Sequence, residues 1–135
     1  MLGWVNDIEE LTLENTTFRT VVYTGEYSQL TVMSVEVGDE IGNEMHGDVD
    51  QFLRIEQGKA KVTFGPADGE IVETHEAEAD WAIIVPAGTW HNVVNVGDEP
   101  LKLYSIYSPA NHPDGTVHET KADADAAEAA EHAHE

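Results

Sequence analysis

The 135-residue sequence has no cysteine, and it has only 6 lysine and arginine residues against 27 aspartate and glutamate residues. Without cysteine, we expect neither disulfides nor metal sites built from thiolates. Long apolar runs are also missing, because the most apolar segment, Trp81 to Val85, is far too short to span a bilayer. The acidic N-terminus lacks the basic and apolar regions of a secretory signal. These absences predict a cytoplasmic protein with no membrane partner.

The shortage of cations leaves a formal net charge of −21. Without residues 117–135 there remain 21 acidic and 5 basic residues, so the bias is spread along the chain. Such a surface repels nucleic acid, which we therefore exclude as a partner. Self-repulsion on this scale favours a high-salt interior, where charges are screened. We interpret the chain as a halophilic protein, although an acidic protein of an ordinary cytoplasm has the same composition.

Short β-type segments separated by Gly, Pro and Asp dominate the sequence, and they predict an all-β fold in one domain. Alternation and β-branched or aromatic residues mark the segments 18–24, 28–37, 51–55, 59–64, 70–75, 81–86, 90–96 and 101–107. The segment 81–86 is a short run that is apolar on both faces. A β-barrel or sandwich follows from this pattern.

The two ends of the chain carry weaker signals. Residues 1–17 have no sustained period, and a short strand or turn around Asp7 to Leu13 is all they predict. The alanine-rich, acidic segment from Lys121 to Ala133 has almost no apolar face, which suits either a solvated helix or a disordered segment. We therefore expect a single domain over residues 1–116 and an acidic tail over residues 117–135.

Four polar side chains could converge on a metal ion. Glu44 and His46 lie two positions apart, so on an extended segment they share one face. Gln51 opens the next apolar strand, and His91 follows about forty residues later in the segment PAGTWHNVVN. Two histidines and one carboxylate suit divalent first-row metals and leave positions open for a substrate. Gln51 could add an amide oxygen or hydrogen-bond to His46 instead.

The spacing of these residues resembles the two motifs of the cupin superfamily. The first reads Gly38, five residues, Glu44-x-His46, four residues, Gln51, six residues, Gly58. The second reads Asp80, five residues, Pro86-Ala87-Gly88, two residues, His91, three residues, Asn95. The resemblance implies a cupin-type double-stranded β-helix, or jelly-roll barrel. It also implies that Glu44, His46, Gln51 and His91 are the metal ligands, and proteins of this kind are often homodimers.

Three positions depart from the pattern of the family. Glu44 stands in place of the usual first histidine, and Gln51 stands in place of the usual glutamate. Carboxylate and neutral ligand have thus changed places, and the net ligand charge is retained. Asp80 replaces a turn glycine, and aspartate tolerates the left-handed conformation better than most residues. The run QFLRI, PAGTWHNV and HPDGT resembles short cupins often described as mannose-6-phosphate-isomerase-like.

Two functions fit this site. The first is an enzyme that uses Fe, Mn, Ni or Zn on a small sugar or keto/hydroxy acid, with isomerisation ahead of dioxygen chemistry. The second is a non-catalytic module that binds or senses a small ligand. A roomy pocket favours the enzyme, and a pocket sealed by Met45 and Trp90 favours the module. A third hypothesis makes the barrel a dimerisation unit with a relic site. No catalytic residue is identified, although a tyrosine near the metal would be the best general acid or base.

The remaining charged and titratable residues have simpler expected roles. Arg54 should face outward and pair with a glutamate. Arg19 should anchor a buried carboxylate, with substrate binding as the minor alternative. His75, His112 and His118 are expected in surface positions or loops.

Overall fold

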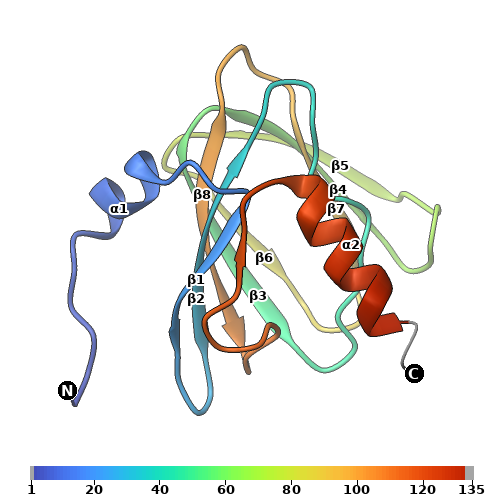
Figure 1. The fold of residues 1–135 in the computed structure, drawn as a ribbon. Coiled ribbons are helices and arrows are strands. Elements are labelled where there is room, and N and C mark those ends of the chain that lie inside the picture. The colour runs from blue at the N-terminus through green and yellow to red at the C-terminus, as the bar shows by residue number, and fades with distance from the viewer. Residues whose placement is uncertain (1, 133–135) are drawn as a thin grey trace.

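Two antiparallel β-sheets pack face to face in the computed structural model, which describes residues 2–132 (Figure 1). The larger sheet has the strand order β6-β3-β8-β2-β1-β9, and the smaller sheet has the order β5-β4-β7. The strands are β1 (Arg19–Thr24), β2 (Gln29–Val35), β3 (Asp50–Gln57), β4 (Lys59–Gly65), β5 (Glu73–Glu78), β6 (Ala82–Val85), β7 (Trp90–Asn95), β8 (Leu101–Ser108) and β9 (Val117–His118). The helices are α1 (Ile8–Glu14) and α2 (Lys121–His132). The chain is therefore mostly β and jelly-roll-like, as expected.

The space between the sheets is apolar at one end and polar at the other. Alternation along β3 turns Gln51, Leu53 and Ile55 inward, and all three are buried. Antiparallel pairing places Ile55 opposite Leu103 of β8 and Gln51 opposite Tyr107. The apolar end continues into a core to which both sheets contribute. The polar end holds the candidate site.

The eight strands predicted from the sequence are all present, with shifted ends. The largest shift is in β5, which was expected over 70–75 and occupies Glu73–Glu78. Gly65-Pro66-Ala67-Asp68-Gly69 forms the turn before it. Here the backbone oxygen of Glu70 lies so close to Gly65 that a Cβ would overlap it.

Only one of the two apolar faces of β6 is buried. Ile83 and Val85 are buried, but Ile84 is 65% exposed and the preceding Trp81 is 53% exposed. β6 is the edge strand of the larger sheet, and only its inner face packs on the core.

The prediction for the N-terminal segment was wrong, because Ile8–Glu14 is a helix. Asp7 caps it by accepting a 3.1 Å hydrogen bond from the backbone N–H of Glu10. Glu9 and Glu10 lie in the first turn, where acidic residues favour the helix dipole. Thr12 is buried, and α1 contacts β8, β3 and β2. Capping and packing, rather than an apolar period, specify this helix.

The C-terminal tail begins with a strand and ends with a helix. Val117 and His118 pair with β1, so that His118 lies opposite Arg19. Of the two alternatives for the acidic segment, the structure has the helix, and Ala124 of α2 is buried against the core. Positions 133–135 of the expected tail lie outside the described residues. Within 2–132, no helix combines the length and hydropathy needed to cross a membrane.

Asp80 occupies the turn position where the motif usually has glycine. Its φ is 75°, the left-handed conformation expected for this position. Its backbone N–H donates to the oxygen of Ile55 at 2.8 Å, and its carboxylate accepts from Arg54 at 3.1 Å. Arg54 also pairs with Glu56 at 3.0 Å, which confirms the outward ion pair predicted for it.

Candidate metal centre and its pocket

Backbone pairing brings the two halves of the site together. Glu44 and His91 form an isolated antiparallel bridge in which each N–H donates to the other's carbonyl oxygen at 2.9 Å. Two residues later, the carbonyl oxygen of His46 accepts a 2.7 Å hydrogen bond from Gly88. The segment before β3 is therefore held against the start of β7. This pairing places Glu44, His46 and His91 side by side.

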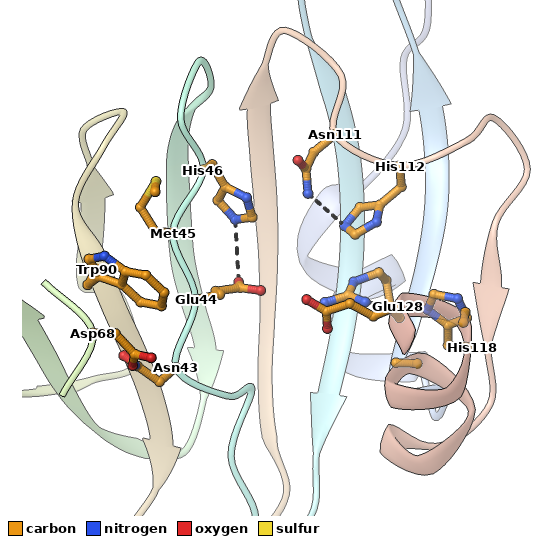
Figure 2. A pocket seen from close by; sticks show the side chains of 13 residues that line it. Asn43, Glu44, Met45, His46, Asp68, Trp90, Asn111, His112, His118 and Glu128 are labelled. Atoms are coloured by element: carbon orange, nitrogen blue, oxygen red, sulfur yellow. Dashed lines mark hydrogen bonds and ion pairs between the residues drawn. The ribbon is translucent and has the colours of Figure 1, made fainter. Parts of the chain in front are cut away.

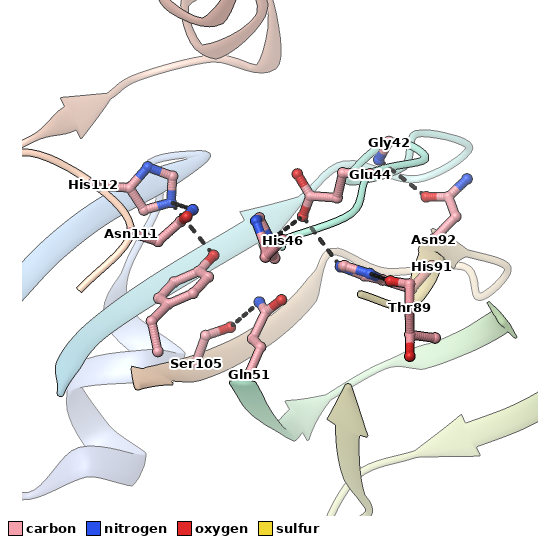
Figure 3. Close-up of polar contacts among 11 residues, drawn as sticks. Gly42, Glu44, His46, Gln51, Thr89, His91, Asn92, Ser105, Asn111 and His112 are labelled. Atoms are coloured by element: carbon pink, nitrogen blue, oxygen red, sulfur yellow. Dashed lines mark hydrogen bonds and ion pairs between the residues drawn. The ribbon is translucent and has the colours of Figure 1, made fainter. Parts of the chain in front are cut away.

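The three side chains converge at one point. The Oε1 atom of Glu44 lies 3.4 Å from Nε2 of His46 and 3.4 Å from Nε2 of His91 (Figure 3). One ligand atom from each residue can be chosen so that all lie within 4.8 Å of one another. Such spacing is what three ligands of a single ion require, since each bond to a first-row metal is about 2.0–2.2 Å long.

Several buried polar atoms at this point have no hydrogen-bond partner. Among the described residues, these atoms include Oε1 of Glu44, Nε2 of His46, Nε2 of His91 and Oε1 of Gln51. Buried polar atoms without partners are rare and unfavourable, because each has lost its hydrogen bonds to water. A cation bound by Glu44, His46 and His91 would satisfy three of them, and the amide oxygen of Gln51 is the candidate fourth ligand atom. The donor set therefore fits a divalent metal ion.

Neighbouring hydrogen bonds orient two of these side chains. Nδ1 of His91 lies 3.0 Å from the carbonyl oxygen of Thr89, so Nδ1 carries the proton and Nε2 keeps a free lone pair. The amide nitrogen of Gln51 donates to the hydroxyl of Ser105 at 3.3 Å, which leaves the amide oxygen without a protein partner (Figure 3). Gln51 thus donates to Ser105 and not to His46, the hydrogen-bond partner that the sequence analysis had considered.

The pKa of Glu44 lies well below its usual value. Burial alone would raise it, but contacts with His46 and His91 outweigh burial and stabilise the ionised form. Glu44 is thus a carboxylate at neutral pH. A metal ion bound here would therefore have one anionic ligand, Glu44.

A cavity of about 500 Å³ opens beside this cluster (Figure 2). Glu44, Met45, His46 and Trp90 lie on one side of it, and Asn111, His112, His118 and Glu128 lie on the other. Its lining comprises Arg19, Asn43, Glu44, Met45, His46, Asp68, Trp90, Asn111, His112, His118, Ala124, Ala127 and Glu128. Met45 is 41% exposed. Met45 and Trp90 therefore border an open pocket and do not seal it.

His112 and Tyr107 are site residues that the sequence analysis did not identify. His112 was expected at the surface or in a loop, yet it lines the pocket, and its ring packs edge-on against Tyr107. Its Nε2 lies 3.4 Å from the Tyr107 hydroxyl, and the Tyr107 ring in turn meets His46 edge-on. Burial and the nearby Arg19 lower the pKa of His112 to about 3, and burial raises the pKa of Tyr107. The sequence signal for His112 was its place in the segment HPDGT, which resembles a segment of short cupins.

Arg19 also lines the pocket and is only 7% exposed. The expectation that it anchors a carboxylate of the chain is not met among residues 2–130, whose side chains the structure describes, because Arg19 forms no such ion pair there. Its Nη1 lies 3.4 Å from Nδ1 of His118, and its guanidinium lies 5.3 Å from the centroid of the Phe18 ring. His118, like His112, therefore belongs to the pocket.

Comparisons with known proteins place this site in a family. The sequence matches the Cupin domain family over residues 31–107. The Bacillus subtilis (strain 168) protein YrkC is 56% identical over 125 residues, which cover 93% of this chain and 67% of that protein. A crystal structure of a Bacillus halodurans protein is 51% identical, with a TM-score of 0.90, and the match covers 91% of this chain and 93% of that one.

A more distant likeness connects the fold to an enzyme. The Bacillus subtilis oxalate decarboxylase is 26% identical with a TM-score of 0.58, and the match covers 64% of this chain and 23% of that one. Mn(II) centres are described for that decarboxylase. Together the matches support a small single-domain protein of the family, and they do not extend the likeness to mannose-6-phosphate isomerase.

Proposed function

The chain belongs to the cupin family, and we propose that it is a metal-dependent enzyme acting on a small sugar or keto/hydroxy acid. Glu44, His46, His91 and Gln51 would hold one divalent ion. The convergence of Glu44, His46 and His91, whose buried donor atoms lack hydrogen-bond partners, beside an open cavity of about 500 Å³ carries this proposal. When bound, the ion would supply Lewis-acid polarisation of a substrate oxygen or, if redox-active, dioxygen chemistry.

The chain's own residues would prepare the substrate for proton transfer. The bridge between Glu44 and His91 fixes the ligands in advance, so little reorganisation is needed when a metal or substrate enters. His112 is neutral at pH 7 and faces the pocket, where it can accept or donate a hydrogen bond to a substrate hydroxyl or carbonyl. The Tyr107 hydroxyl contacts its Nε2 and can orient the ring. Isomerisation by proton transfer stays ahead of dioxygen chemistry in this proposal.

One observation favours a non-catalytic, ligand-binding role instead. Efficient acid–base catalysts have a pKa near the working pH. Here the pKa of His112 is about 3 and that of Tyr107 is raised, so neither changes charge near neutral pH. A module that captures or senses a small ligand needs no such group, and it would use the same metal.

Metal content tests the site directly. Untagged protein, purified in molar salt without chelator, would be analysed by mass spectrometry for Fe, Mn, Ni and Zn. We expect about one equivalent of one metal in wild type and almost none in His91→Ala. His75→Ala is the matched control, because His75 is an exposed histidine of β5 that pairs with Glu73. No metal in wild type, even after reloading with each of the four ions, would overturn the proposal.

Turnover then separates the enzyme from the binding module. Metal-loaded protein would be incubated with aldoses, ketoses and keto or hydroxy acids, with and without dioxygen, and the products followed by NMR. The enzyme predicts conversion that is lost in His91→Ala. A compound that binds tightly without conversion supports the module.

A further inference from the structure

Arg19 is a buried cation without an anionic partner in the described chain. Its side chain lies in the pocket wall and is 93% buried, since only 7% is exposed. The Nε atom is buried and makes no hydrogen bond within residues 2–132. A buried guanidinium that lacks a counter-charge is strongly unfavourable, because it has lost water and gained nothing comparable.

The groups that contact the guanidinium are a histidine, an aromatic ring and a phenol. His118 contacts Nη1, the Phe18 ring lies beneath the guanidinium, and the hydroxyl of Tyr107 lies close by. Three carboxylates line the same pocket, those of Glu44, Asp68 and Glu128, yet none of them forms an ion pair with Arg19. This is unexpected in a chain with 27 acidic residues.

The chain's other arginine shows the ordinary arrangement. Arg54 lies on the outer face of the sheet and pairs with Glu56 at 3.0 Å and with Asp80 at 3.1 Å. Arg54 is thus paired with two carboxylates at the surface, whereas Arg19 in the pocket has no carboxylate partner among residues 2–130, whose side chains the structure describes. This difference leaves Arg19 available to an anion that enters the pocket.

We infer that Arg19 binds a carboxylate of the small-molecule ligand, whose other oxygens face the metal centre. This inference rests on the proposed function, because it assigns a substrate class to the same pocket. Arg19 pairs with His118, and Figure 2 places His118 on the side of the pocket opposite Glu44 and His46. The ligand is therefore an acid with polar groups at both ends, such as a dicarboxylate or a keto or hydroxy acid with a distal carboxylate.

A carboxylate fits this wall better than a phosphate does. One guanidinium offers a planar pair of N–H donors that matches the two oxygens of a carboxylate. A phosphate carries about two negative charges, and this pocket has no lysine and no second arginine among its lining residues. Glu128, on the same side of the pocket as His118, would also repel the second negative charge that a phosphate concentrates at one point.

Calorimetric titration of Mn(II)-loaded protein tests the inference. The probes are malonate, succinate and glutarate, each paired with its monoamide, which keeps the shape and removes one charge. Glycerol phosphate is the phosphate arm. The variants are Arg19→Met, Arg19→Lys and, as the matched control, Arg54→Met, which removes the same charge from the outer face. Metal content and thermal unfolding are measured for each variant.

We expect the best dicarboxylate to bind wild type about tenfold more tightly than its monoamide. The ratio of the two dissociation constants, monoamide to dicarboxylate, should fall to about one in Arg19→Met. It should be partly restored in Arg19→Lys and unchanged in Arg54→Met. Arg19→Met should keep its metal and be at least as thermally stable as wild type, since it loses an unpaired buried charge.

Three results would overturn the inference. One is a ratio that Arg19→Met leaves unchanged, and another is tighter binding of glycerol phosphate than of any dicarboxylate. The third is a large loss of thermal stability in Arg19→Met, which would make the residue structural. These results can be distinguished from a failure of the proposed metal site, because metal content is measured separately. If the protein binds no metal, the preference for the dicarboxylate and its dependence on Arg19 can still be measured in metal-free protein.

Discussion

Glu44 and His91 exchange two backbone hydrogen bonds of 2.9 Å each, and their side chains approach to 3.4 Å. A residue on the loop before β3 and a residue of β7 are thus locked together by main-chain atoms alone. The side chains need not be drawn together by a bound ion, because the backbone already sets their positions. Substitutions of these side chains should therefore affect ion binding far more than folding.

Glu44→Gln should weaken metal binding without unfolding the protein. The substitution keeps the shape of the side chain and both backbone hydrogen bonds, but it removes the negative charge of the ligand set. We expect the affinity for Mn(II) to fall about 10- to 100-fold, as measured by competition with a chelating dye. Glu73→Gln, an exposed glutamate of β5, is the control and should bind Mn(II) like wild type. Equal affinities in the two variants would contradict the assignment of Glu44.

Gln51→Leu tests the fourth donor. The amide oxygen of Gln51 is buried without a partner, so leucine of similar volume removes an unsatisfied atom from the metal-free protein. Metal-free stability should stay the same or rise, and the affinity for Mn(II) should fall about tenfold. Urea unfolding and metal titration measure the two effects. If affinity is unchanged, Gln51 only packs beside Ser105 and is no ligand.

Stability should depend on pH through His112. Its pKa is about 3 in the folded chain and near 6.5 when unfolded, so between these values the unfolded state binds more protons. Stability therefore rises with pH in this window and is lost as pH falls through it, by up to about 1.4 kcal/mol per pH unit. Urea unfolding between about pH 4 and pH 7 should show a shallower slope for His112→Gln than for wild type.

The control for this pH dependence is His75→Gln. His75 is exposed on β5, lies 3.2 Å from Glu73 and is not among the residues that line the pocket. Its replacement should leave the wild-type slope in place. A His112→Gln slope that matches the wild-type slope would show that the histidine is charged in the folded protein.

Asp80→Ala should destabilise the turn before β6. Alanine has neither the carboxylate that pairs with Arg54 nor aspartate's tolerance of a φ of 75°. We expect a loss of about 1 kcal/mol in the free energy of unfolding. Asp80→Gly should lose less, because glycine adopts this conformation freely. Equal losses would assign the effect to the ion pair instead of the backbone.

The fold and the core of the site could be predicted from sequence because both are encoded locally. Alternation marks each strand, and the spacing around Glu44, His46, Gln51 and His91 lies within two short motifs. The pocket wall could not be predicted in this way. Arg19 meets His118 across 99 positions, through the pairing of β1 with β9, and neither residue has a local pattern. The helix α1 was missed because its signal is a cap at Asp7. The expected homodimer and the saline cytoplasm stay predictions.

The two sides of the pocket come from different stretches of the chain. The metal-facing residues lie within 31–107, the stretch that matches the family, whereas Arg19, His112 and His118 lie outside it. The candidate metal ligands and the opposite wall of the pocket can therefore diverge independently in evolution. If the proposals above hold, relatives that share residues 31–107 would bind the same metal but different acids, and changes in β1 and in the segment from His112 to His118 would suffice to alter the ligand that is selected.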